Sequence, residues 1–110
     1  MAVNTTTHGN GTVTITGWTA EDWEYDTDGG FDSNIGIKVS SIQFIPSQAS
    51  DRMVVHDGGE ASADLFDSGL TAGVAPIFKN FDPPKWARPW IDYTDIVVGT
   101  TGAKVIIDYV

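Results

Sequence analysis

The most acidic part of the chain is the segment 21–32, EDWEYDTDGGFD, which holds six carboxylates and no cation. Within it, Asp26, Asp28 and Asp32 surround two glycines, and carboxylate oxygens are ligands that calcium prefers. The spacing departs from that of an EF-hand, because the twelfth residue counted from Asp26 is Ile37 and not glutamate. Aspartate and glycine are also typical of tight turns. The segment is therefore a weak calcium candidate or a solvated turn, and we expect an exposed turn with no obligatory metal and no cofactor.

The two histidines, His8 and His56, are the other candidates for chemistry, since the chain has no cysteine. His56 precedes Asp57 and could act as a general base. The serines considered as nucleophiles are Ser47, Ser50 and Ser68. The sequence has no Gly-x-Ser-x-Gly elbow and no glycine-rich phosphate loop. We therefore expect a protein that is not an enzyme, with His56 a polar side chain at the end of a strand.

Aromatic, proline and basic residues concentrate in the segment 77–90, which carries three of the six cations. Three of its aromatic residues are expected in the core: Phe78, Phe81 and Trp90. Trp86 lies close to Lys85 and Arg88 and is expected to be exposed. Tryptophan and arginine frequently anchor protein interfaces. Trp86, Arg88 and Lys85 are therefore the predicted partner contact.

Period-2 alternation of polar and apolar residues predicts the elements that must position these side chains. The expected strands cover residues 11–17, 35–44, 52–56, 74–81, 90–94, 96–98 and 104–110, with a hairpin turn at 99–103. Ile37 and Val39 fall on one parity and Ile42 and Phe44 on the other, which predicts a β-bulge near Ser40 and Ser41. Short helical turns are possible only at 19–25 and 60–66.

These elements predict one all-β domain over residues 1–110, an antiparallel β-sandwich or small β-barrel of seven to eight strands. Residues 1–10 are expected to form a flexible N-terminal arm. The predicted core comprises Val13, Ile15, Ile37, Val39, Ile42, Phe44, Val54, Ile77, Phe81, Ile91, Tyr93, Val105 and Ile107.

Charge and composition exclude several classes of partner. The chain of 110 residues has a formal net charge of −9, and its first 37 residues contain no lysine or arginine. Binding to nucleic acid or to an anionic membrane needs clustered cations, so neither is expected. No apolar run approaches the length of a membrane helix. The N-terminus also lacks the features of a signal peptide.

Two segments resemble a group of small all-β virion proteins of tailed bacteriophages. These segments are SIQFIPS at 41–47 and DRMVVHD at 51–57. The motif FDPP at 81–84 and the apolar final strand fit the same resemblance, which covers residues 37–110. These are strand and turn patterns that contain no catalytic residues.

The resemblance implies a structural part of the phage particle. A capsid decoration (cement) protein is the first expectation, and a head–tail neck or tail protein is the second. The implied partners are the major capsid protein or other virion subunits. The protein is expected to form a homo-oligomer, with a trimer favoured, and to reside in the virion after assembly in the host cytoplasm. A carbohydrate-binding β-sandwich module that uses Trp86 or Trp90 as a platform is the alternative from another functional class.

Overall fold

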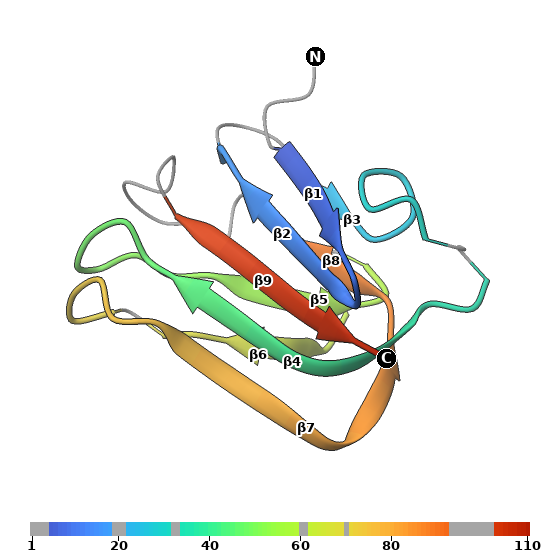
Figure 1. Cartoon of the computed structure of the whole chain (residues 1–110). Helices are drawn as coiled ribbons and strands as arrows, with labels where there is room; N and C mark the ends of the chain where they lie inside the picture. The colour runs from blue at the N-terminus through green and yellow to red at the C-terminus, as the bar shows by residue number, and fades with distance from the viewer. Residues whose placement is uncertain (1–4, 19–21, 32–33, 60–61, 70, 93–102) are drawn as a thin grey trace.

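The computed structural model describes residues 5–18, 22–31, 34–59, 62–69, 71–92 and 103–110. These residues form nine strands and no helix, so none of them belongs to a helix that could cross a membrane. The strands make two antiparallel sheets that face each other as a sandwich (Figure 1). The predicted all-β fold is therefore confirmed.

The two sheets contain five and four strands. The larger sheet has the order β1 (Thr5–Gly9), β2 (Thr12–Thr16), β9 (Lys104–Tyr109), β4 (Ile37–Ile45) and β7 (Ile77–Ala87). The smaller sheet has the order β3 (Trp23–Glu24), β8 (Pro89–Ile91), β5 (Val54–Asp57) and β6 (Asp64–Asp67). The chain passes from the larger to the smaller sheet at Arg88, between β7 and β8. Gly36 lies against this corner, because a Cβ there would come within 2.5 Å of the Ala87 carbonyl oxygen.

The predicted bulge in β4 is confirmed. The register of β4 shifts between Val39 and Ser41 against both of its neighbours, and Val39 and Ile42 are both fully buried. On the β7 side, Asn80 lies opposite Ser41 and Lys85 lies opposite Val39. The four residues 81–84 therefore face a single residue of β4. The FDPP motif thus forms a bulge in an edge strand.

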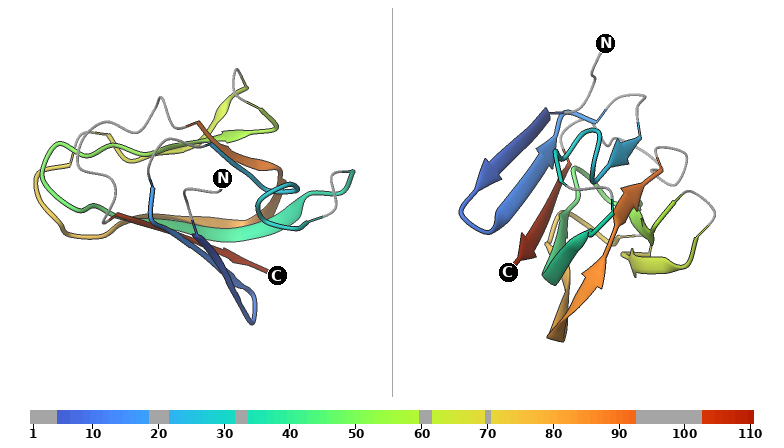
Figure 2. Two further views of the ribbon diagram at one scale, coloured as in Figure 1. Left: turned by 90° about the horizontal axis from the view of Figure 1, so that it is seen from above. Right: turned by 90° about the vertical axis from the view of Figure 1, so that its right-hand side faces the viewer.

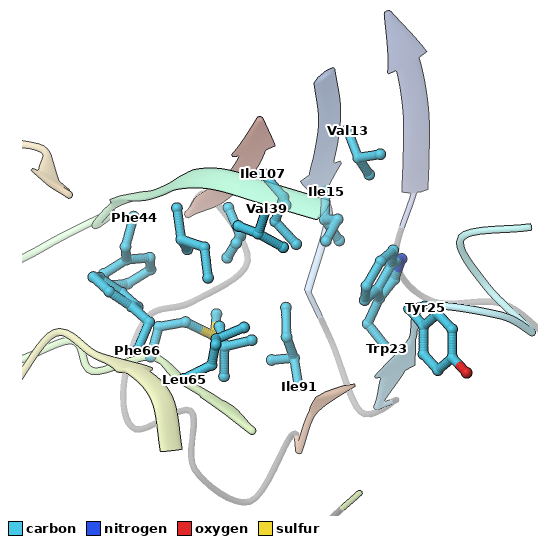
Figure 3. Packing of buried hydrophobic residues seen from close by; sticks show 14 of the residues in the cluster. Val13, Ile15, Trp23, Tyr25, Val39, Phe44, Leu65, Phe66, Ile91 and Ile107 are labelled. Atoms are coloured by element: carbon cyan, nitrogen blue, oxygen red, sulfur yellow. The ribbon is translucent and has the colours of Figure 1, made fainter. Parts of the chain in front are cut away.

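The core fills the space between the sheets (Figure 3). Ten of the thirteen predicted core residues are buried: Val13, Ile15, Ile37, Val39, Ile42, Phe44, Val54, Ile91, Val105 and Ile107. Ile77 and Phe81 are only partly buried, and Tyr93 lies outside the described residues. The largest additions that the sequence did not predict are Trp18 and Trp23, both fully buried.

Several local predictions need correction. Thr5–Gly9, assigned to a flexible arm, forms β1 and pairs with β2. Residues 64–66 of the second possible helical turn belong to β6. In the first possible helical turn, 19–25, residues 23–24 form β3, while residues 19–21 lie outside the described part of the chain. The strand at 96–98 and the hairpin turn at 99–103 lie almost wholly outside it as well.

The expectation that Phe78 belongs to the core is also wrong, since its side chain is 60% exposed. Phe78 lies opposite Gln43 on the outer face of the larger sheet. β7 has no described neighbour on its other side that could cover the ring. Trp90, also expected inside, is half-buried.

Candidate docking surface

Five large hydrophobic side chains are exposed in the described part of the chain, and three of them share one hollow. Ile35, Trp86 and Val110 are 60%, 58% and 74% exposed. They line this hollow together with the half-buried rings of Phe31 and Tyr109. These five residues are called the end patch, because the turn before β4, the last part of β7 and the C-terminus meet at the end of the sandwich that faces the viewer in the right panel of Figure 2.

Strand pairing places Trp86 on the surface. Trp86 lies directly opposite Lys38 of β4, and opposed residues of two strands point to the same face of a sheet. Val39, the next residue of β4, is fully buried and points toward the core. Lys38 and Trp86 therefore point away from the smaller sheet, and Lys38 also lines the hollow. The predicted exposure of Trp86 is confirmed.

Aromatic contacts and backbone hydrogen bonds hold the remaining side of the end patch. The Phe31 ring packs edge-to-face on Tyr109, with 5.2 Å between ring centroids, and on His8 at 5.6 Å. The N–H of Val110 donates to the carbonyl oxygen of Lys38 at 2.9 Å. Segments far apart in the sequence thus form one ordered surface, which has little conformational entropy left to lose on binding.

The other two predicted contact residues lie on different sides of β7. Arg88 borders a second hollow next to Trp86 and is anchored by two hydrogen bonds. Its backbone N–H donates to Asp57 Oδ1 at 3.0 Å, and its Nη2 donates to the carbonyl oxygen of Asn34 at 3.0 Å. Lys85 is exposed, but successive side chains of a strand point to opposite faces. The structure therefore brings Trp86 and Arg88 together and places Lys85 on the other face.

The calcium candidate is a tightly wound turn whose carboxylates bond to its own backbone. Asp28 Oδ2 accepts the N–H of Glu24 at 2.9 Å, and Asp26 Oδ1 accepts the N–H of Thr27 at 2.8 Å. Asp32 lies outside the described residues. Among the described residues, no group of three or more histidine, aspartate and glutamate side chains is placed to hold a metal ion.

The same turn carries strong negative charge. We call Asp22, Glu24, Asp26 and Asp28 the acidic turn. Burial raises the pKa of Glu24, and the negative charges of Asp26, Asp28 and Asp22 raise it further. The N–H of Phe31 donates to the carbonyl oxygen of Tyr25 at 3.1 Å, so the turn ends on a residue of the end patch. An acidic and an apolar surface are therefore adjacent.

The described contacts of His56, Ser47 and Ser68 involve different partners. His56 Nδ1 lies 3.2 Å from Asp64 Oδ1, so a carboxylate from β6 lies beside the imidazole. The hydroxyl of Ser47 donates to Asp51 at 2.7 Å, and that of Ser68 donates to a backbone carbonyl at 2.8 Å. Each of these two hydroxyls thus donates to an acceptor other than the imidazole.

The two remaining exposed hydrophobic side chains are near the start of β7. Val74 precedes the strand, and Phe78 is its second residue. Val74 and Phe78 are each 60% exposed. Phe78 and Ile77 line a hollow together with all four residues of β6. This side of the sandwich is open, because β7 and β6 are edge strands of the two sheets (Figure 1). Ile77 and Phe78, which line this hollow, are called the edge patch.

The sequence did not point to most of the end patch. The alternation of residues 35–44 predicts Ile35 as an ordinary strand residue, and the acidic pattern of 21–32 predicts no role for Phe31. Tyr109 and Val110 lie more than 70 residues further along the chain. No local pattern joins such segments, so only the strand order brings them together.

Comparison with known protein families, curated proteins and solved structures finds no match to this chain.

Proposed function

We propose that this protein is a structural component of a tailed-phage particle, in first place a capsid decoration protein. The observation that carries the proposal is the presence of two separate exposed apolar surfaces, the end patch and the edge patch, on one small sandwich. A protein that bridges subunits needs more than one docking surface. Exposed apolar surface of this kind marks interaction sites. The proposed role involves no catalysis.

The position in the particle follows from the resemblance of residues 37–110 to small phage virion proteins. Within this proposal, the edge patch binds the major capsid protein or another virion subunit. The strongly acidic remainder of the chain keeps free copies soluble before they dock. A place in the neck or tail is the alternative position for the same type of protein.

Co-sedimentation with particles of the source phage that lack this protein tests the proposal. The wild-type chain should bind such particles, and Phe78→Ala should weaken binding by about tenfold, because Phe78 is the exposed ring of the edge patch. Asn80→Ala, an exposed change on the same strand, is the matched control. Separated heads and tails distinguish a capsid site from a neck or tail site. Absence of wild-type binding to either would overturn the proposal.

A carbohydrate-binding role is the second candidate, because the exposed Trp86 ring lies beside Asp57 and Arg88. An aromatic platform with neighbouring polar groups can hold a sugar ring. It ranks second because Asp57 and Arg88 are already hydrogen-bonded within the chain. Oligosaccharide titrations followed by tryptophan fluorescence test it. Saturable binding that Trp86→Ala abolishes would favour this role over the structural one.

A further inference from the structure

One end of the sandwich carries surfaces of opposite charge side by side. Lys38 lines the hollow of the end patch and Arg88 borders Trp86. The acidic turn runs directly into this patch through Phe31. Figure 2, right panel, looks onto this end, with the turn, the start of β4, the C-terminus and the corner between β7 and β8.

Four of these charged side chains, Lys38, Glu24, Asp26 and Asp28, form no ion pair with another described residue. The ion pairs among the described residues are Arg52 with Asp67 and His56 with Asp64. Lys38, Glu24, Asp26 and Asp28 take part in neither of them. Lys38 is also one of few cations on a chain of net charge −9. Both signs are thus available for contacts with another molecule.

We propose that the end patch binds a second copy of this chain across a two-fold axis, so that Trp86 and Lys38 of each copy meet the acidic turn of the other. This inference rests on the proposed function, in which the end patch is a protein contact, and it names the partner. A two-fold interface must be self-complementary: if one region contacts another, the reciprocal contact also forms. An end that carries a cationic apolar patch next to an acidic turn meets this requirement.

The charges determine how the two copies are offset. If each end patch faced its own equivalent directly, Lys38 would lie close to the Lys38 of the other copy, and like charges repel. An offset toward the acidic turn replaces this repulsion with attraction and keeps the apolar side chains at the centre of the contact. Charges at the rim of an interface set its register, while a buried aromatic anchor contributes most of the binding energy.

The arrangement also relieves an unfavourable interaction within each copy. The pKa of Glu24 is raised by burial and by neighbouring carboxylates, so its charged form is unfavourable in the single chain. A lysine from the second copy favours the charged form and lowers this pKa. Dimer formation should therefore weaken at acidic pH and at high salt.

Charge reversal on each side of the contact tests the proposal by analytical ultracentrifugation. The wild-type chain should form a dimer, and Lys38→Glu or Glu24→Lys alone should raise the dimer dissociation constant by about tenfold or more. An equimolar mixture of the two variants should restore the dimer, because both contacts of the mixed dimer then pair opposite charges. Lys104→Glu is the matched control, since Lys104 is exposed at the other end of β9. It should leave the dimer intact.

Each other outcome counts against the two-fold contact. A wild-type chain that stays monomeric at about 100 μM, or that forms a trimer, overturns it. Failure of the mixture to restore the dimer also overturns it, provided that both variants unfold in urea as cooperatively as the wild type. Particle binding is scored separately. A dimer that binds no particle contradicts only the proposed function, and a monomer that binds particles contradicts only this inference.

Discussion

Asp51 is the carboxylate whose removal should destabilise the fold most. It is fully buried, and its Oδ2 accepts three hydrogen bonds. The donors are the N–H of Ser47 at 2.8 Å, the hydroxyl of Ser47 at 2.7 Å and the N–H of Gln48 at 3.3 Å. The carbonyl oxygen of Asp51 also accepts the N–H of Thr71 at 3.0 Å. This residue therefore fixes the loop between β4 and β5 to the segment after β6.

The size of the effect follows from these bonds. A hydrogen bond to a charged group contributes about 1.5–3 kcal/mol when both partners are shielded from water. Gln48 is exposed and Ser47 half-buried, so water can replace part of the loss. We therefore expect Asp51→Ala to lower the free energy of unfolding by about 2–4 kcal/mol. Asp51→Asn keeps an acceptor oxygen but loses the charge, and should lower it by about 1–2 kcal/mol.

Urea unfolding followed by tryptophan fluorescence measures these differences, at concentrations that keep the chain monomeric. Glu24→Gln is the control, because it removes the same formal charge and leaves the three hydrogen bonds to Asp51 Oδ2 in place. The expected order of destabilisation is Asp51→Ala, then Asp51→Asn, then the control. An Asp51→Ala variant within about 0.5 kcal/mol of wild type would refute the reasoning, since surface changes reach that size.

Three further outcomes are expected in the same assay. Phe44→Ala should destabilise by about 3–5 kcal/mol because Phe44 is fully buried, whereas Phe78→Ala should stay within about 1 kcal/mol because its ring is mostly exposed. Glu24→Gln should stabilise slightly at neutral pH, because a raised pKa makes the charged form unfavourable; the gain should vanish once the pH falls below the usual value of 4.5. Asp67→Asn should destabilise at neutral pH, because hydrogen bonds from Arg52 hold the pKa of Asp67 below its usual 3.8. The loss of stability should shrink as the pH falls through the lowered pKa of Asp67. A loss that persists at the most acidic pH would contradict a stabilising ion pair between Arg52 and Asp67.

The sequence predicted the fold well where buried and exposed residues alternate along a strand. The change of parity between Val39 and Ile42 correctly located the bulge, because only an extra residue keeps both side chains in the core. Phe78 shows where this reasoning fails. The polar and apolar residues around Phe78 alternate as in any strand. The exposure of Phe78 arises because β7 is an edge strand, which only the strand order reveals.

The candidate site was predictable only in part for the same reason. Trp86 could be identified because tryptophan beside basic residues is uncommon in a core. Its neighbours Phe31, Ile35 and Val110 belong to segments that meet only after β4, β7 and β9 have paired. Asp51 likewise resembles a surface turn residue until the loop folds over it.

Three of the four edge strands, β7, β3 and β6, hinder an extension of the sheets, which favours association through side chains at the end of the sandwich. β7 is the longest edge strand, yet it carries the four-residue bulge 81–84 with two prolines, and Lys79 and Lys85 flank it. Bulges, prolines and lysines each hinder pairing with another strand. At the edges of the smaller sheet, β3 has two residues and β6 has four, with a carboxylate at each end. With backbone pairing hindered at these edges, the ordered apolar surface around Trp86 is the better place for a second copy to bind.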